Sequence, residues 1–328
     1  MSNQILTMLE QHKEGFLSGE VLSQELKISR TAVWKQIKKL ESQGYQFEAS
    51  RRLGYRLIGK PSKLSVHELM DKLSGSTLIK AIKLHDSVDS TQNIAHRLAE
   101  DDALEGTLVI AEQQTSGRGR MGRKWISPTG KGVWMSLVLR PKLPLQVASQ
   151  LTLLTAVALC RALRTVAAPL EIGIKWPNDL LINGKKISGI LLESTAEEER
   201  LKYVIAGIGI SVNLEESDYP QELRDIATSL RLELGRPLDR AEVIASFIRE
   251  FEQLYTAYQK DGFGFIRSLW EALSVSLHKP MQLKTANGMQ IGTPIGLDES
   301  GALLATFENG ATIPIFSAET LPAPDNRS

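Results

Sequence analysis

The chain has few residues of the kinds that hold a secreted or metal-dependent protein together. Its 328 residues include one cysteine and five scattered histidines, so we expect no disulfide framework and no metal held by its own side chains. No apolar run approaches a membrane span, and the N-terminus lacks the basic, apolar and small-residue order of a signal peptide. The sequence therefore predicts a cytoplasmic protein without a membrane partner. Cys160 lies in the apolar periodic stretch "LTLLTAVALCRAL", which indicates a buried, inert thiol.

Acidic residues are scarce in two segments. Residues 27–60 carry nine lysines and arginines but only two glutamates, although the whole chain has a net charge of +1. The remainder of the chain is therefore mildly acidic, and a basic N-terminal module on an acidic body predicts a polyanion partner for that module. No acidic residue occurs between Glu112 and Glu171, where nine lysines and arginines stand. We expect an anion to bind near that segment too.

The N-terminal pattern predicts three short helices followed by a hairpin. Ser29 can cap the third helix, whose inward stripe is Val33, Ile37 and Leu40. "YQFEA" and "YRLI" then alternate like strands around the basic turn "SRRLG". This is the order of a winged helix-turn-helix, whose third helix enters the major groove while the wing touches the DNA backbone. The alternative is a protein-binding module with a solvated basic face. The side chains expected to contact DNA are Arg30, Thr31, Lys35, Lys38, Arg51 and Arg52.

The rest of the chain predicts an α+β fold. The linker "GKPSKLS" is followed by helical stretches near 91–101, 146–166 and 239–259 and by many strand-like runs. "INGKKI" has the Asn-Gly signature of a tight hairpin, and "EEER" at 197–200 fits the solvated turn of another. Short strands with turns close the chain and predict a small all-β barrel. The expected domains are a winged helix over 1–62, a catalytic domain over 63–272 and the barrel over 273–328.

The stretch "TSGRGRMGRKW", 115–125, contains the dinucleotide-binding string G-x-G-x-x-G. A dinucleotide fold also needs a helix opening at the glycines and an acidic residue roughly 20 positions on. Here Pro128, Gly130 and Gly132 break the continuation, and no acid follows until Glu171. A G-x-x-x-x-G-K-[ST] phosphate loop is absent as well. We predict instead a mobile loop whose arginine forks bind carboxylate and phosphate, with a plain basic surface loop as the alternative.

Four segments in order carry a resemblance to a known family. They are "DSVDSTQNIA" (86–95), "EQQTSGRGRMGRKW" (112–125), "KWPNDLLINGKKISGILLE" (175–193) and "AGIGISVN" (206–213), and together they resemble the biotin-protein ligases. With the winged helix, the whole chain is similar to the bifunctional bacterial form, which is biotin ligase and biotin operon repressor. The resemblance implies a central catalytic domain of the biotin/lipoyl ligase type and a C-terminal SH3-like barrel.

The resemblance also implies an activity, ligands and partners. Family members join biotin to ATP, giving biotinyl-5′-adenylate and pyrophosphate, and pass the biotinyl group to a lysine of a carboxylase subunit such as biotin carboxyl carrier protein. Mg²⁺ is expected with ATP. As a repressor, the chain is expected to bind operator DNA as a homodimer when it holds the adenylate. The 115–125 loop would become ordered on the adenylate and so complete or expose the dimer surface. DNA affinity should then rise with biotin and ATP together.

Site residues follow by matching the family's motifs. The first step brings two anions together, so catalysis should be mainly charge neutralisation and positioning. The expected catalytic residues are Lys186 and Arg118. Biotin binding is expected from Ser90, Thr91, Gln92, Gln114, Arg118, Gly119, Arg120, Lys186, Gly207 and Gly209, and ATP binding from Arg120, Arg123, Trp125 and Asn178.

Several of these assignments have a simpler structural alternative. Ser90 and Thr91 fit a helix N-cap, a strand glycine such as Gly207 fits a bulge, and Asn178 fits a turn after a proline. A solvated hairpin lysine is the alternative for Lys186, although it fits Lys185 better. Two positions depart from the family pattern. Ser211 stands where relatives commonly have asparagine, and Met121 stands where many have a basic residue. Competing functions are a lipoate or octanoate ligase on the related fold, and a ligand-sensing transcription factor that has lost catalysis.

Overall fold

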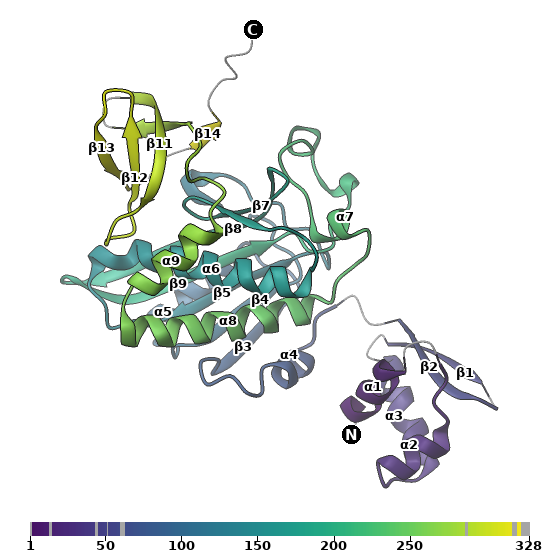
Figure 1. Cartoon of the computed structure of the whole chain (residues 1–328). Helices are drawn as coiled ribbons and strands as arrows, with labels where there is room; N and C mark the ends of the chain where they lie inside the picture. Colours follow the sequence, from purple (N-terminus) through teal and green to yellow (C-terminus); the bar gives the residue numbers. More distant parts are fainter. Residues whose placement is uncertain are drawn as a thin grey trace. The chain divides into compact units, whose positions relative to one another are not determined.

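The computed structural model describes residues 2–12, 15–42, 45–50, 52–59, 63–285, 288–316 and 320–322. The chain forms two compact units, Met1–Leu64 and Ser65–Ser328 (Figure 1). The predicted domain limits at residues 62 and 272 stay predictions.

The N-terminal unit contains the predicted three helices and hairpin. Ser29 caps the third helix, where its Oγ accepts a hydrogen bond from the amide of Ala32 at 3.1 Å, a contact that typically contributes about 1 kcal/mol. The predicted stripe Val33, Ile37 and Leu40 is buried in a core with side chains of the first two helices. The prediction of a winged helix-turn-helix is confirmed. Its elements are α1 (Ser2–Gln11), α2 (Gly19–Glu25), α3 (Arg30–Ser42), β1 (Gln46–Ser50) and β2 (Gly54–Gly59).

The larger unit is built on a seven-stranded mixed sheet. β3 and β4 are parallel, and all other neighbours are antiparallel. The central strands are mostly buried and apolar, as in β5, where every residue is buried, because both faces of the sheet are covered at its centre. The order across the sheet is β3 (Ala81–His85), β4 (Thr107–Ala111), β5 (Val133–Leu139), β9 (Arg200–Ile210), β8 (Lys185–Glu197), β7 (Asp179–Ile182) and β6 (Gly173–Lys175).

Helices cover the two faces of this sheet unequally. α5 packs on β4, β5 and β9, whereas α6 packs on β6 to β9 and against α8 and α9. Figure 1 shows α6, α8 and α9 gathered on one side of the sheet. One face therefore stays partly open beside α5. The helices are α4 (Val66–Lys72), α5 (Thr91–Glu100), α6 (Ala148–Val166), α7 (Leu230–Leu234), α8 (Arg240–Asp261) and α9 (Gly264–Leu273), with 3₁₀ turns at Arg120–Gly122, Leu145–Val147, Glu216–Asp218 and Gln221–Leu223.

The apolar segment Leu145–Val166, which contains α6, is long and apolar enough to cross a membrane. Most of it is buried inside this unit, so it serves as a core helix here. Cys160 lies on it and is fully buried, as predicted. Burial raises the pKa of the Cys160 thiol to about 11, which keeps the sulfur protonated and unreactive near neutral pH.

The C-terminal strands form a five-stranded antiparallel sheet, consistent with the predicted small β domain. Its interior is apolar, with Leu283, Leu297 and Leu303 buried. The turn before β12 is held on α6, because Gln150 donates to the carbonyl of Glu299 at 2.8 Å. The order is β13 (Thr312–Ile315), β12 (Leu303–Phe307), β11 (Gly288–Leu297), β10 (Met281–Thr285) and β14 (Thr320–Pro322).

Candidate active site and nucleic-acid interface

Glycines form part of the open face of the large sheet. Gly209 on β9 stands opposite Gly189 on β8, and an added Cβ at Gly209 would lie 2.4 Å from Trp125 Nε1. Two residues along, an added Cβ at Gly207 would lie 2.4 Å from Gln92 Oε1. The side chains of Trp125 and Gln92 therefore rest directly on bare strand backbone. We call Gly189, Gly207 and Gly209 the glycine floor.

Buried polar side chains meet at one end of this floor, where α5 begins. The Oε1 atom of Gln114 accepts from the backbone amide of Thr91 at 2.9 Å and from its hydroxyl at 3.1 Å. Gln92 accepts from Ser136 at 2.9 Å and donates to the carbonyl of Ile205 at 3.2 Å. These predicted biotin-binding residues lie together. Ser136 was missed, and its only signal was one polar residue inside the apolar run "VWMSLVL".

Ser90 also belongs to this polar end. Its side chain caps α5 by accepting from the amide of Gln92 at 3.3 Å, and it is buried. The N-cap alternative is therefore correct as a structural description. It leaves the hydroxyl proton available to a ligand, because a hydroxyl donates once and accepts twice.

The arginine-glycine loop is a narrow hairpin. Gly119 donates to the carbonyl of Arg123 at 2.7 Å, and Trp125 donates to the carbonyl of Gly117 at 2.8 Å. Its tip, Arg120–Gly122, is a 3₁₀ turn in which Met121 has a left-handed φ of 56°. An added Cβ at Gly117 would lie 2.5 Å from the Trp125 carbonyl. No α-helix begins at these glycines, although a dinucleotide-binding loop would require one. The loop is therefore not of the dinucleotide-binding type, as the sequence predicted.

The loop arginines have separate partners. Arg118 donates to Asn93 at 2.7 Å and lies 3.4 Å from Glu193. Arg120 donates to Oδ1 of Asn178 at 3.1 Å, and Asn178 in turn donates to the carbonyl of Ile190 at 2.7 Å. Burial lowers the pKa of the Arg120 guanidinium, while the charge of Asp179 opposes that shift. The Arg120 cation is therefore drawn inward, and Arg118 stays near the surface.

Lys186 lies over the glycine floor. Its Nζ is 2.7 Å from Asp179 Oδ1 and 5.3 Å from the centroid of the Trp125 ring. The tight turn at Asn183 and Gly184, whose φ angles are 49° and 80°, places Lys186 at the start of β8. The predicted Asn-Gly hairpin is confirmed. The lysine is thus tied to the site, whereas its neighbour Lys185 donates to the carbonyl of Arg224 at 3.0 Å.

Trp125 and the segment after β9 close the other end of the floor. The Trp125 indole packs edge-on against buried Trp134, and its buried Nε1 has no hydrogen-bond partner within the described residues. Ser211 is buried, and its carbonyl accepts from the amide of Leu230 at 3.0 Å. Burial raises the pKa of Tyr219 to about 12, although a hydrogen bond with Ser211 opposes the shift. Ser211, which stands where relatives commonly have asparagine, therefore lies within a packed segment.

A buried ion pair fixes the chain before the loop. Glu112 receives two hydrogen bonds from Arg240 at 2.9 and 3.2 Å, and both side chains are less than 5% exposed. Arg240 also donates to the carbonyl of Gly132 at 3.1 Å. Removing one partner of such a pair typically costs about 3–5 kcal/mol. The sequence did not reveal this pair, because its members are 128 positions apart.

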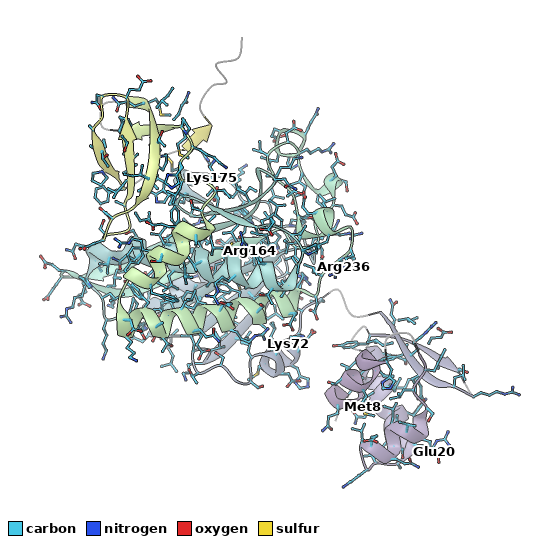
Figure 2. All side chains as sticks on the ribbon, viewed as in Figure 1. Met8, Glu20, Lys72, Arg164, Lys175 and Arg236 are labelled. Carbon is cyan, nitrogen blue, oxygen red and sulfur yellow. The ribbon has the colours of Figure 1, made fainter. Side chains whose placement is uncertain are left out.

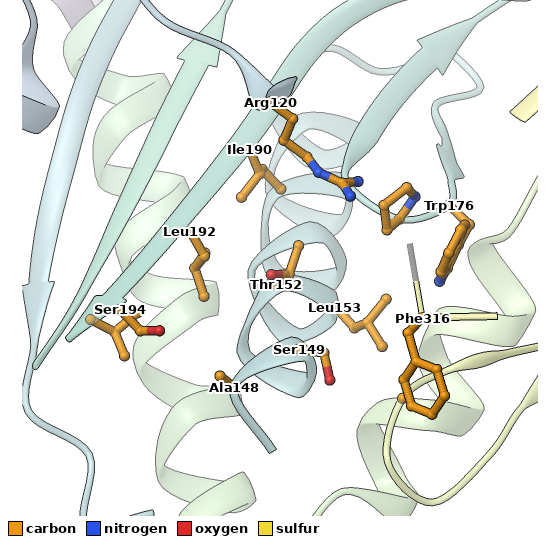
Figure 3. A pocket seen from close by; sticks show the side chains of 13 residues that line it. Arg120, Ala148, Ser149, Thr152, Leu153, Trp176, Ile190, Leu192, Ser194 and Phe316 are labelled. Atoms are coloured by element: carbon orange, nitrogen blue, oxygen red, sulfur yellow. The ribbon is translucent and has the colours of Figure 1, made fainter. Parts of the chain in front are cut away.

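A cavity of about 240 Å³ lies on the opposite, α6 face of the sheet. Ile190 and Leu192 line it, and these residues alternate with the floor positions of β8. Figure 3 shows the Arg120 guanidinium above Thr152 and Leu153 of α6, with Phe316 of the C-terminal segment nearby. Arg120 is the predicted site residue that reaches this cavity. Among the described residues, no cluster of His, Cys, Asp or Glu could hold a metal ion.

The predicted DNA-contacting face is exposed on α3. The side chains of Arg30, Thr31, Lys35 and Lys38 all lie on the surface, and Lys38 pairs with Glu41 at 2.6 Å. Trp34, which is 50% exposed, shares this face and was missed by the sequence analysis. In the wing, Arg52 is exposed, while Arg51 lies outside the described residues.

Comparisons with known proteins agree with this geometry. The HTH domain model matches residues 2–56, and the biotin/lipoate A/B protein ligase family model matches residues 84–211. The chain is 48% identical over 315 residues to the bifunctional ligase/repressor BirA of Bacillus subtilis (strain 168), covering 96% of each chain. The chain belongs to the bifunctional biotin ligase/repressor family. The BirA of Escherichia coli (strain K12) is 31% identical over 93% of this chain and 94% of its own.

A solved structure of this family shares the fold of the larger unit. The biotin protein ligase from Aquifex aeolicus, in complex with biotin and ATP, superposes with a TM-score of 0.64 at 31% identity, covering 75% of this chain and all of that one. The family predicted from the four segments is therefore confirmed. The roles of individual residues within the site stay predictions.

Proposed function

We propose that this protein joins biotin to ATP and transfers the biotinyl group to a lysine of a carboxylase subunit. A carboxylate oxygen of biotin attacks the α-phosphorus, the bond to the β-phosphate oxygen breaks, and pyrophosphate leaves. The lysine amine of the acceptor then attacks the acyl carbon, loses a proton and displaces AMP. The observation that carries the proposal is the glycine floor, with a cluster of neutral polar side chains at one end and the Lys186–Asp179 pair at the other.

The polar end suits the ureido ring of biotin. A buried ureido group needs both donors and acceptors, since an unpaired polar group costs about 1–3 kcal/mol. Ser90, Thr91 and Gln114 supply hydroxyls and an amide there, and Gln92 keeps Gly207 covered. A ureido ring bound at this end would take its hydrogen bonds from this group. Lipoate has no ureido ring, so this end favours biotin.

The charged end suits the reacting carboxylate and phosphate. Lys186 carries its ammonium on a flexible stem and can follow charge from the carboxylate to the α-phosphate. Arg118, Gly119 and Arg120 belong to the hairpin loop, whose glycines allow its backbone to approach the adenylate closely. The loop would bind both the biotin carboxylate and the α-phosphate. Arg118 and Lys186 would be the catalytic residues.

The nucleotide is assigned to the side of Trp125. The indole offers a face for adenine, and its Nε1 donor has no hydrogen-bond partner among the described residues. Arg120, Arg123 and Asn178 are assigned to the phosphates. Mg²⁺ would enter with ATP. It commonly keeps several of its waters and binds through the phosphates of its nucleotide, and no separate protein cage is present among the described residues.

The acceptor is proposed to be biotin carboxyl carrier protein or another biotin-dependent carboxylase subunit. A biotin–[acetyl-CoA-carboxylase] ligase of Paracoccus denitrificans is 37% identical over 66% of this chain, which supports an acceptor of that class. The same chain is proposed to work in the cytoplasm as a biotin-responsive repressor. Its winged helix binds operator DNA as a homodimer, with biotinyl-5′-adenylate as corepressor.

Pyrophosphate exchange tests the catalytic proposal. Labelled pyrophosphate should enter ATP in the presence of biotin and not in the presence of lipoate or octanoate. Exchange with lipoate alone would favour a lipoate-type ligase. Absence of exchange with all three acids would favour a ligand sensor without catalysis.

A further inference from the structure

One row of residues crosses the sheet beneath the charged end of the site. Lys175 on β6 stands opposite Asp179 on β7, Asp179 opposite Gly189 on β8, and Gly189 opposite Gly209 on β9. Directly opposed residues in antiparallel strands point to the same face of a sheet. Lys175, labelled in Figure 2, therefore shares the face of the glycine floor and occupies its β6 end.

Lys175 differs from the other cations of the site in its partners. Lys186 has Asp179 at 2.7 Å, and Arg120 has the side-chain oxygen of Asn178 at 3.1 Å. Within the part of the chain that the structure describes, the Lys175 ammonium has neither a hydrogen bond nor an ion pair, although the residue is half-buried. Burial lowers the pKa of the Lys175 ammonium, and the charges of Lys186 and Arg123 lower it further, against the attraction of Asp179.

A half-buried ammonium next to other cations is unfavourable unless an anion joins them. On this face of the sheet, Lys175 and Lys186 both lie near the carboxylate of Asp179, and Lys186 forms the ion pair with it at 2.7 Å. The two ammonium groups therefore offer positive charge at separate positions along one row. Such a row matches a polyphosphate better than the single carboxylate of biotin.

The in-line geometry of the reaction indicates where the polyphosphate of ATP would lie. In phosphoryl chemistry the attacking and leaving oxygens lie roughly in line on opposite sides of the phosphorus. On the proposed function, biotin lies at the Gly207 end of the floor and its carboxylate approaches from the β9 side. The leaving oxygens then depart across β8 and β7 toward β6, where Lys175 lies.

We propose that Lys175 binds the β- and γ-phosphates of ATP and stabilises the leaving pyrophosphate. The inference rests on the proposed function and adds a residue to it. The ammonium donates hydrogen bonds and forms no covalent bond. Negative charge develops on the leaving pyrophosphate as the α-phosphorus–oxygen bond breaks, and the positive ammonium is already in place to stabilise it. Transfer of biotin from the finished adenylate involves no pyrophosphate and should not need Lys175.

The test compares Lys175→Met with Lys175→Arg, and uses Lys83→Met as a matched control. Lys83 is an exposed lysine on β3, far from the floor in the strand order. Pyrophosphate exchange with biotin should fall about 10- to 100-fold in K175M, as expected for one lost charged contact. K175R should recover much of the rate, and K83M should match the wild type.

Two further measurements separate a phosphate role from a structural one. Pyrophosphate should inhibit adenylate formation by K175M at least tenfold less strongly, while single-turnover transfer from pre-formed biotinyl-5′-adenylate to the acceptor stays within twofold of wild type. Normal exchange and normal pyrophosphate inhibition in K175M would overturn the inference. Equal losses in exchange and in transfer would also overturn it, since they indicate a structural defect. If the wild type shows no exchange, the proposed function itself fails.

Discussion

At the scale of single residues, glycine determines how closely a ligand can approach the sheet. Gly207 and Gly209 have Gln92 and Trp125 within 2.4 Å of where a Cβ would stand. A methyl group at either position would move a side chain that belongs to the proposed site. In the proposed function the two positions also differ in ligand, since Gly207 faces the ureido end and Gly209 the nucleotide end.

Replacing Gly209 by alanine should therefore impair nucleotide binding first. The methyl group displaces the Trp125 indole, so we expect the KM for ATP to rise several-fold, with a loss of about 1–3 kcal/mol of unfolding free energy from overpacking. Steady-state kinetics and denaturant titration measure the two effects. Gly264→Ala on α9, with open space around its Cβ, should change neither. An unchanged KM for ATP in G209A would remove Gly209 from the nucleotide end.

Lys186 is the residue on which the first reaction step depends most in our proposal. Lys186→Ala should lower pyrophosphate exchange about 100- to 1000-fold, the effect typical of losing one transition-state contact. Its thermal unfolding should stay close to that of the wild type, because Lys186 is only half-buried. Lys185→Ala is the control, as its side chain caps a carbonyl outside the floor. Near-normal exchange in K186A would exclude Lys186 from catalysis.

At the scale of elements, α3 presents a basic face with one large aromatic at its centre. Trp34 is turned away from the core that Val33, Ile37 and Leu40 form, so its exposure serves no packing purpose. Lysines beside it provide charge for phosphates, and an aromatic can contact base edges such as the thymine methyl group. The helix thus combines two kinds of contact that mutation can separate.

Trp34→Ala and Lys35→Ala should weaken operator binding in different ways. K35A should lower affinity for all DNA and reduce the slope of log K against log salt by about 1. W34A should lower operator affinity and leave both that slope and binding to random DNA unchanged. Fluorescence anisotropy over a salt series distinguishes the two. Equal losses on operator and random DNA in W34A would contradict a base-contacting role.

Elements with a strong local pattern could be predicted from the sequence, and others could not. β5 and α6 are long apolar runs, and the Asn183–Gly184 turn has a fixed local signature. β3 was missed because, at the sheet edge, its residues are partly exposed and alternate weakly. Ser136, Lys175 and the Glu112–Arg240 pair gain their roles from contacts between distant strands and helices, which no local spacing encodes. The sequence motifs identified the candidate site residues. The register of the sheet then showed which of them lie side by side.

At the scale of the whole molecule, the two activities share one ligand. The unit Ser65–Ser328 forms the adenylate, and the unit Met1–Leu64 presents the basic helix. A repressor controlled by adenylate must have greater operator affinity when the catalytic unit is occupied, since a ligand shifts an equilibrium only by its differential affinity. Synthesis and regulation can therefore be uncoupled in a mutant that binds adenylate but cannot make it.

Operator affinity should rise with biotin and ATP together, and not with either alone. In K186A, biotin and ATP together should no longer raise it, whereas added biotinyl-5′-adenylate should restore at least part of the increase. Gel-shift titration with sedimentation analysis measures affinity and dimerisation on the same samples. Operator affinity that does not change with biotin, ATP or biotinyl-5′-adenylate would contradict the corepressor model.

The buried Glu112–Arg240 pair has a consequence for how this unit opens. It ties the strand before the loop to the first turn of α8, so neither can detach without leaving a charge in the interior. We therefore expect local opening to be easier in the hairpin between Gly117 and Trp125 than at Glu112 and Arg240, whose backbone amides should exchange with solvent more slowly. The arginine-glycine loop could then open without breaking this buried ion pair.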